Sequence, residues 1–159
     1  MNQGNRSDEY QALAQFRFLI RRYLNNGEKA ARSVGLEPQQ YMSLLAVQGL
    51  PTNQEATIRS LAERLQIQHH SAVELVDRME KRGLFRRERS KRDRRHVILH
   101  VTPHGEKLLS KLVRHRISEL RVAAPALTRA LHSVLHATSR NGKGKPRRNS
   151  ARKSADSRK

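Results

Sequence analysis

Residues 57–105 contain three local patterns in a fixed order, and this order restricts the fold more than any other feature of the sequence. The first pattern is a short amphipathic helix, predicted over residues 61–65, where Ser60 and Glu63 have the spacing of a capping box. A turn of only a few residues, at residues 66–68, separates it from a second amphipathic helix. This succession predicts a helix-turn-helix.

The second helix is predicted from about residue 69 to residue 82. Its apolar residues recur at intervals of three and four and therefore share one face; they are Ala72, Leu75, Val76 and Met79. The polar residues between them are expected to face solvent; they are His70, Ser71, Glu74, Asp77, Arg78 and Lys81. Gly83 stands where a residue of left-handed conformation commonly ends a helix.

A basic hairpin is predicted directly after this helix, with strands at residues 85–89 and 97–101 joined by residues 90–95. Between Lys81 and Arg95 the chain has nine Lys or Arg residues and two acidic residues, a net charge of +7. A hairpin that is merely charged and solvated is the alternative. Its position favours a DNA-binding wing instead, because a helix fits the major groove while an adjacent hairpin can reach the backbone or the minor groove.

The sequence resembles the winged helix-turn-helix of the MarR family of bacterial transcriptional regulators in four stretches, LAERL, LVDRMEKRGL, RDRR and LHVTPHGEKLL. The resemblance extends over about residues 10–136. It implies a mainly α fold with a small antiparallel β-wing and with N- and C-terminal dimerisation helices. It also implies a homodimer that binds a pseudo-palindromic operator in double-stranded DNA. Such proteins are most often repressors that a small-molecule effector releases from DNA.

The expected domain organisation has three parts. Residues 1–9 are expected to be a disordered N-terminus, and residues 138–159 a disordered basic tail in which nine Lys or Arg residues accompany one acidic residue. Residues 10–137 form the MarR-like domain in this interpretation. Its parts are the dimerisation helices at 10–35 and 103–137 and the DNA-binding winged helix-turn-helix at 57–102. We favour a role in DNA affinity for the tail over a merely solvated extension.

Two helices are predicted before the helix-turn-helix. The first starts at Tyr10, reaches to about Ala31, and carries an apolar stripe made of Leu13, Phe16, Ile20 and Tyr23. The second has Pro38 in its first turn, and its buried side is expected to hold Tyr41, Leu44, Leu45 and Val47. The family resemblance further implies a minimal strand at Thr57 and Ile58, beside the wing.

Two more helices are predicted after the wing. Thr102 can cap one that has Pro103 at its first position and runs to about Arg121, and Pro125 fits the start of a last helix. Both ends of the chain therefore carry apolar stripes that a winged domain alone would not cover. They predict a homodimer, with a monomeric core as the alternative.

The residues expected to bind DNA form two groups. The first lies at the start of the second helix of the helix-turn-helix and consists of Gln68, His69, His70, Ser71, Val73 and Glu74. The second lies in the wing, by resemblance to the family, and consists of Arg92, Asp93, Arg94 and Arg95. There Asp93 would hold one arginine while Arg94 or Arg95 enters the minor groove. Arg86 and Arg87 are expected to contact phosphate or to be solvated.

The net charge of +19 implies an acidic polymer or a membrane surface as partner and argues against a metabolic enzyme. With no apolar run of about 18 residues and no signal-peptide core, we expect a cytoplasmic protein without a membrane partner. The absence of cysteine excludes disulfides, thiolate chemistry and a cysteine sensor of peroxides.

Other functions receive less support from the sequence. His132 and His136 have the spacing of two metal ligands on one helix face, but no third ligand stands nearby in sequence, and we expect neither a metal nor a cofactor. No catalytic residues are predicted, because no nucleophile motif or glycine-rich loop is present. The alternative to a sequence-specific regulator is a sequence-independent nucleic-acid-binding protein driven by the basic wing and tail. An enzyme or a purely structural interaction module is a third possibility.

Overall fold

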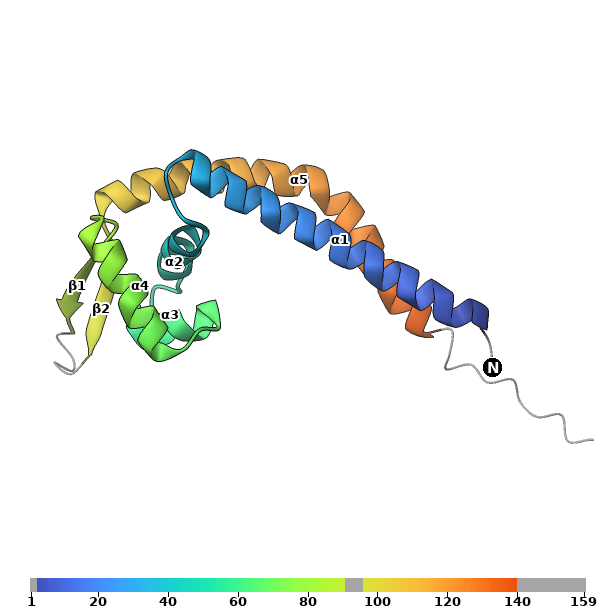
Figure 1. The fold of residues 1–159 in the computed structure, drawn as a ribbon, viewed down its shortest axis with the longest axis horizontal. Helices are drawn as coiled ribbons and strands as arrows, with labels where there is room; N and C mark the ends of the chain where they lie inside the picture. The colour runs from blue at the N-terminus through green and yellow to red at the C-terminus, as the bar shows by residue number, and fades with distance from the viewer. Residues whose placement is uncertain (1–2, 91–95, 140–159) are drawn as a thin grey trace, which may run out of the picture.

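The computed structural model describes residues 3–90 and 96–139. In these residues the elements follow in the order α1 (Gln3–Ser33), α2 (Pro38–Gln48), α3 (Ile58–Leu65), α4 (His69–Lys81), β1 (Phe85–Arg89), β2 (Val97–Val101) and α5 (Pro103–Ser139). The helices α1 and α5 lie side by side and form a long arm, while α2, α3, α4 and the β1–β2 hairpin form a winged domain at one end of it (Figure 1). The predicted mainly α winged-helix fold is confirmed.

Helix α1 begins earlier than the sequence predicts. The structure places residues 3–9 in α1, where we expected a disordered segment and a helix start at Tyr10. The polar residues of this stretch give no apolar periodicity by which a helix could be predicted. A polar turn can nevertheless extend a helix whose later turns are held by packing, because propagation is easier than nucleation.

The C-terminal part of the arm is one helix, whereas two were predicted. Helix α5 runs without a break from Pro103 to Ser139 and contains Pro125 in its interior. Proline lacks an N–H group and so removes one helical hydrogen bond, which usually ends or bends a helix. In this chain α1 packs along α5, and α5 curves along its length rather than breaking (Figure 1). The prediction of a separate last helix was therefore wrong.

Helix α2 starts as the sequence predicts, with Pro38 at its first position. Glu37 is the N-cap, and the Gln40 side chain completes a capping box by accepting a hydrogen bond from the Glu37 N–H at 3.1 Å. Of the four apolar residues expected on the buried side, Tyr41 and Leu44 are buried and Val47 is half-buried. Leu45 is 36% exposed, which corrects its predicted burial.

Helix α3 starts one turn before the predicted position. Thr57 is its N-cap, and Thr57 and Ser60 form a reciprocal capping box with N···O distances of 3.1 and 2.9 Å. The box predicted between Ser60 and Glu63 is therefore wrong, and Glu63 instead pairs with Arg59 at 3.2 Å. Thr57 forms an isolated antiparallel bridge with Ile98 of β2, so the minimal strand expected at this point is limited to Thr57.

The turn, helix α4 and the hairpin match their predicted positions. Gln66 adopts the left-handed conformation (φ 54°) and ends α3, and Gly83 does the same after α4 (φ 65°). Beyond Gly83, the Leu84 N–H donates to the Met79 carbonyl at 2.9 Å. Strands β1 and β2 then pair antiparallel in a register that sets Phe85 opposite Val101 and Arg89 opposite Val97.

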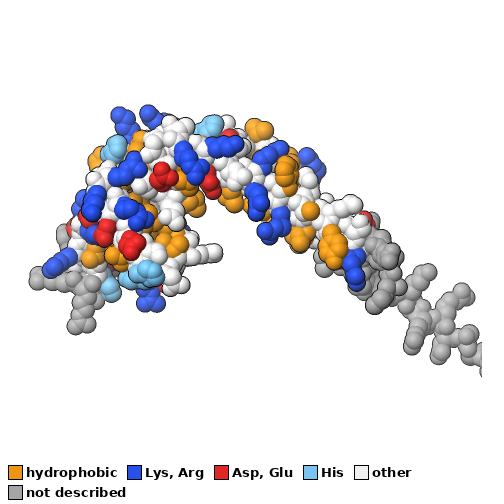
Figure 2. Space-filling model, in the orientation of Figure 1, with side chains coloured by type: hydrophobic (Ala, Val, Ile, Leu, Met, Phe, Trp, Pro, Cys, Tyr) orange, Lys and Arg blue, Asp and Glu red, His pale blue; other side chains and the backbone are white. Residues whose placement is uncertain are grey.

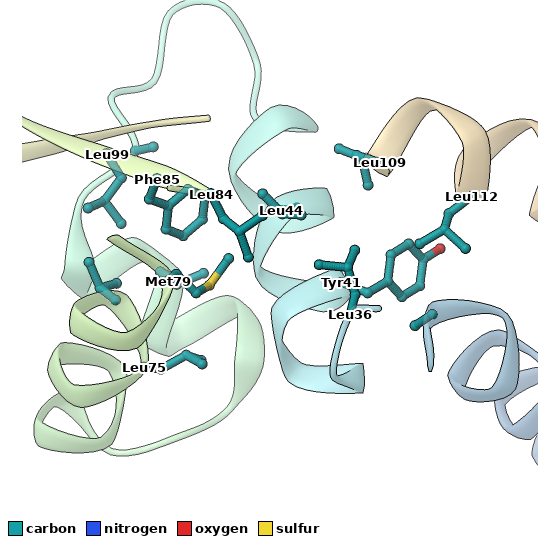
Figure 3. Packing of buried hydrophobic residues seen from close by; sticks show 14 residues of the cluster. Leu36, Tyr41, Leu44, Leu75, Met79, Leu84, Phe85, Leu99, Leu109 and Leu112 are labelled. Carbon is teal, nitrogen blue, oxygen red and sulfur yellow. The ribbon is translucent and has the colours of Figure 1, made fainter. Parts of the chain in front are cut away.

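Basic side chains are spread over both the arm and the winged domain, as Figure 2 shows for one face of the molecule. Beneath them, one core joins the two parts (Figure 3). Leu44 of α2 lies at its centre, with Leu84 on the winged-domain side and Leu109 of α5 on the arm side (Figure 3). The core requires glycine at position 105, because a Cβ there would lie 2.6 Å from the Leu84 carbonyl oxygen. The start of α5 is thereby fixed closely against the hairpin.

Candidate nucleic-acid interface

Helix α4 presents its first turns to solvent. Its apolar face, with Ala72, Leu75, Val76 and Met79, is buried as predicted. Gln68 is the N-cap, and its side chain makes no capping hydrogen bond. The side chains of Gln68, His69, His70 and Glu74 are exposed, whereas those of Ser71 and Val73 are half-buried. The six positions expected to meet bases therefore lie at or beside an accessible helix surface.

Arg87 fixes the hairpin to helix α4. Its guanidinium contacts Asp77 at 2.5 Å and Glu80 at 3.0 Å, and its backbone N–H donates to the other Glu80 oxygen at 3.2 Å. The guanidinium presents several donors in one plane, so that it can hold both carboxylates at once. Arg87 thus braces the hairpin against α4 instead of being a solvated or phosphate-binding residue. The acids three residues apart on α4 were the only sequence signal for this contact.

The opposite face of the hairpin carries a second set of paired charges. Arg86 contacts Glu88 at 2.7 Å, and the His100 ring nitrogen lies 3.3 Å from the same carboxylate. Arg86 and His100 are also cross-strand partners in the ladder. With Arg87 on one face and Glu88 on the other, the described strands expose no acidic group that lacks a nearby arginine. The acidic side chain of the hairpin therefore repels an anionic polymer such as DNA less than an unpaired acid would.

The remaining wing residues lie outside the described residues. Arg92, Asp93, Arg94 and Arg95 are among them, so their expected contacts with the DNA backbone and minor groove stay predictions. The ladder that leads to them continues past Arg89, because the Ser90 N–H donates to the His96 carbonyl at 2.9 Å.

A buried arginine lies where the arm meets the winged domain. Arg116 of α5 is 5% exposed, its guanidinium carbon is 3.8 Å from the centre of the Tyr23 ring, and it donates to the Tyr23 carbonyl at 2.6 Å. Its carboxylate partner is Glu119. Burial raises the pKa of the neighbouring Tyr41 phenol above its usual value, and the Arg116 charge acts in the opposite direction. Cation, aromatic ring and carboxylate are thus packed together at this junction.

Two clefts of about 570 and 580 Å³ flank this cluster between α1 and α5. Asn26, His115 and Glu119 line both of them, and Tyr23 lines the first. Volumes of this size are within the range of small-molecule sites. Tyr23 and Tyr41 lie together around Arg116, whereas Phe16 lines neither cleft.

The arm carries large apolar side chains that nothing in the described chain covers. Those that are at least 39% exposed on its two helices are Tyr10, Leu13, Phe18, Leu24, Ile117, Leu120, Val122, Leu131 and Leu135. Exposed apolar surface along two packed helices is typical of a protein–protein interface.

His132 and His136 of α5 stack their rings with centroids 5.9 Å apart. In the described part of the chain, no group of three or more His, Cys, Asp or Glu side chains is arranged to hold a metal ion. Within the same residues, none of the helices is both long enough and apolar enough to cross a membrane.

Comparison with known proteins agrees with this geometry. The sequence model of the MarR family matches residues 34–96. An uncharacterized HTH-type transcriptional regulator of Bacillus subtilis, YsmB, is 28% identical over 95 residues, which are 60% of this chain. The chain spans 63% of the length of that relative.

Two solved structures share the fold at low sequence identity. AbsC, a MarR family transcriptional regulator from Streptomyces coelicolor, is 22% identical with a TM-score of 0.64, over 83% of this chain and 92% of that one. BpsR of Bordetella bronchiseptica, whose DNA binding is regulated by 6-hydroxynicotinic acid, is 19% identical with a TM-score of 0.56, over 77% of this chain and 89% of that one. The MarR family model thus matches the part of the chain that holds the helix-turn-helix, and the solved MarR family regulators share its winged-helix fold.

Proposed function

We propose that the protein is a sequence-specific regulator of transcription that binds double-stranded DNA as a homodimer. The observation that carries this proposal is the accessible start of α4 beside a basic hairpin that Arg87 braces against it. Two such helices about 34 Å apart would fit successive major-groove faces of a pseudo-palindromic operator. The regulator would act in the cytoplasm and as a repressor, the commonest mode in the MarR family that it resembles.

The proposed DNA-binding residues are those expected from the sequence. On α4 they would meet base edges, and in the wing they would meet the backbone and the minor groove. The full set is Gln68, His69, His70, Ser71, Val73, Glu74, Arg92, Asp93, Arg94 and Arg95. Residues 57–102 would form the DNA-binding part, and residues 138–159 would add electrostatic attraction to phosphate.

Dimerisation would use the arm, in agreement with its uncovered apolar side chains. A small molecule bound beside Arg116 could then shift the two winged domains relative to each other. The ligand can release the protein from DNA only if it binds more tightly to the dimer whose two α4 helices, the recognition helices, do not match the operator spacing. The clefts between α1 and α5 support such a site, as does the regulation of BpsR by a small aromatic acid.

Selection of bound duplexes from a random pool tests the proposal. We expect a symmetric consensus that keeps its preference when bulk DNA is added as competitor, because base contacts distinguish sequences whereas phosphate contacts do not. If the selected duplexes instead share no consensus, and bulk DNA displaces them, the protein is the alternative, a sequence-independent nucleic-acid-binding protein.

Glu74 is an exposed acidic residue on the surface of α4 that would enter the major groove. Arg78 lies 3.9 Å from it, and both side chains are largely exposed, so the pair offsets little of the repulsion between Glu74 and phosphate. We expect Glu74→Ala either to relax preference at one base pair, if Glu74 accepts from a cytosine, or to tighten binding to all duplexes. Binding constants on a panel of single-base variants measure both effects. Unchanged affinity and preference would show that α4 docks by another surface.

The basic segment at residues 140–159 has a net charge of +8. Removing it leaves α5 complete at Ser139. We expect the selected consensus to stay the same while the plot of log affinity against log salt becomes less steep, by about 0.9 for each phosphate that the tail no longer neutralises. A tail of equal length with its Lys and Arg changed to Ser should act like the deletion. An unchanged slope in both variants would contradict a role of the tail in binding DNA.

A further inference from the structure

Arg82 connects the end of helix α4 to the turn between α1 and α2. It is the C-cap residue of α4. Its guanidinium donates one hydrogen bond to the Gln40 side-chain oxygen at 2.5 Å and another to the Gly35 carbonyl at 2.7 Å. These partners lie 42 and 47 residues away in the sequence. One side chain therefore links the helix proposed to read DNA to the point where the arm ends.

The Gln40 end of this link is held firmly. Gln40 is 6% exposed, and the oxygen that accepts from Arg82 also accepts from the Glu37 N–H at 3.1 Å in the capping box of α2. Its position is therefore set by the start of α2. A guanidinium can donate to this oxygen and to the Gly35 carbonyl at the same time from one plane, whereas a lysine ammonium is a single point of charge.

The common core, which includes Leu75 and Met79 of α4 and Leu109 of α5, joins α4 to the arm, and exposed Arg82 adds a polar link outside that core. Helix α4 packs on α3 and β1, whereas α1 packs on α5 and α2. Between the end of α1, the start of α2 and the side of α4 lies an open groove of about 400 Å³, lined by Glu28, Arg32, Glu37, Gln39, Leu75 and Arg78. Gln40, which accepts from Arg82, also lines this groove, so side-chain packing is open beside the Arg82 link.

We propose that Arg82 is a positioning residue that sets the orientation of α4 relative to the arm and thereby the half-site spacing that the dimer recognises. The inference rests on the proposed function. In a symmetric dimer joined through the arms, a change of this angle in each copy changes the distance between the two recognition helices. Arg82 would then contribute to selectivity for operator length without touching a base.

The test uses full-length Arg82→Ala and Arg82→Lys proteins and three duplexes, one with the selected spacing and two with one base pair added or removed. Arg32→Ala is the matched control, because it removes an arginine near the same groove whose ion pair with Glu28 at 3.6 Å stays within α1. Affinity for each duplex is measured at one salt concentration, and the thermal midpoint of each protein is recorded.

We expect the wild-type protein and Arg32→Ala to prefer the selected spacing by at least about tenfold, because one added base pair shifts and rotates the second half-site. Arg82→Ala should lose about tenfold in affinity for the selected duplex, the effect of one charge-assisted hydrogen bond, and its preference should fall below about threefold. Arg82→Lys should give an intermediate preference. If Arg82 only stabilised the fold, Arg82→Ala would lower the thermal midpoint and leave the preference between duplexes unchanged.

Two results would overturn the inference. If Arg82→Ala and Arg82→Lys both keep the wild-type ratio between duplexes, Arg82 does not set the spacing, although the proposed function stands. If the wild-type protein shows no preferred spacing at all, the proposed dimeric regulator is itself wrong, and the role of Arg82 is lost with it.

Discussion

We expect Leu131→Glu to convert the protein from a dimer to a monomer at micromolar concentration and to weaken binding to a two-half-site duplex by about 100-fold or more. Leu131 is 43% exposed on the arm, so the substitution places a carboxylate on the surface without disturbing the core. In a symmetric interface the charge is buried twice, and each buried unpaired charge costs several kcal/mol. The affinity falls because a monomer engages one half-site only.

Ser133→Glu is the matched control for this prediction. Ser133 is an exposed residue of the same turn of α5, and its hydroxyl donates to the Arg129 carbonyl at 3.0 Å. The control adds the same charge to the same helix on a face without the apolar stripe. Light scattering measures the oligomeric state of both variants, and titration of a labelled duplex measures affinity. If Leu131→Glu remains a dimer with wild-type affinity, the arm is not the interface.

We expect Leu44→Ala to lower the free energy of unfolding by about 2–5 kcal/mol, the range found for removal of a fully buried leucine side chain. Leu44 is completely buried, and it lies between Leu84 on the winged-domain side and Leu109 on the arm side (Figure 3). The surrounding backbone cannot easily close the cavity, because Gly105 already sets α5 against the Leu84 carbonyl. The loss should therefore lie toward the upper part of the range.

Leu45→Ala supplies the matched control, since it removes the same atoms from the next residue of α2, where the side chain is 36% exposed. Leu45→Ala should lower the free energy of unfolding by less than about 1.5 kcal/mol, because most surface substitutions have small effects. Denaturant unfolding at one fixed protein concentration measures both variants, which removes the contribution of dimerisation to the comparison. Equal losses for the two leucines would show that Leu44 does not join the winged domain to the arm.

The winged helix-turn-helix could be predicted from the sequence because local rules decide its parts. The apolar spacing of α4, the left-handed residue at Gly83 and the alternation in residues 85–89 and 97–101 each act over a few residues, and the structure agrees with all of them. The positions expected at the start of α4 are accessible for the same reason. Their contacts with bases, and all those of residues 92–95, stay predictions.

The features that the sequence did not reveal depend on residues far apart in the chain. Proline is common in the first turn of a helix, so Pro125 predicted a helix start. The helix continues through Pro125 where α1 packs along α5, and this packing involves residues far away in the sequence. The partners of Arg82 and Arg87 come from other elements, and so does the Tyr23 carbonyl that accepts from Arg116, so no spacing rule could assign these contacts. At α3, the sequence predicted a capping box at Ser60 and Glu63, whereas the structure forms it at Thr57 and Ser60, where Thr57 also forms a bridge with the distant Ile98.

Because α5 is continuous, a rotation at one of its ends displaces the other end. Its 37 residues correspond to a length of about 55 Å, with one end seated against β2 and the other at the far tip of the arm. A tilt of about 5° would displace one end by about 5 Å relative to the other, roughly one helical pitch. Pro125 removes one backbone hydrogen bond from this helix without interrupting it. In the proposed dimer, a small rotation of α5 at the interface would therefore produce a displacement of several ångströms at the winged domain.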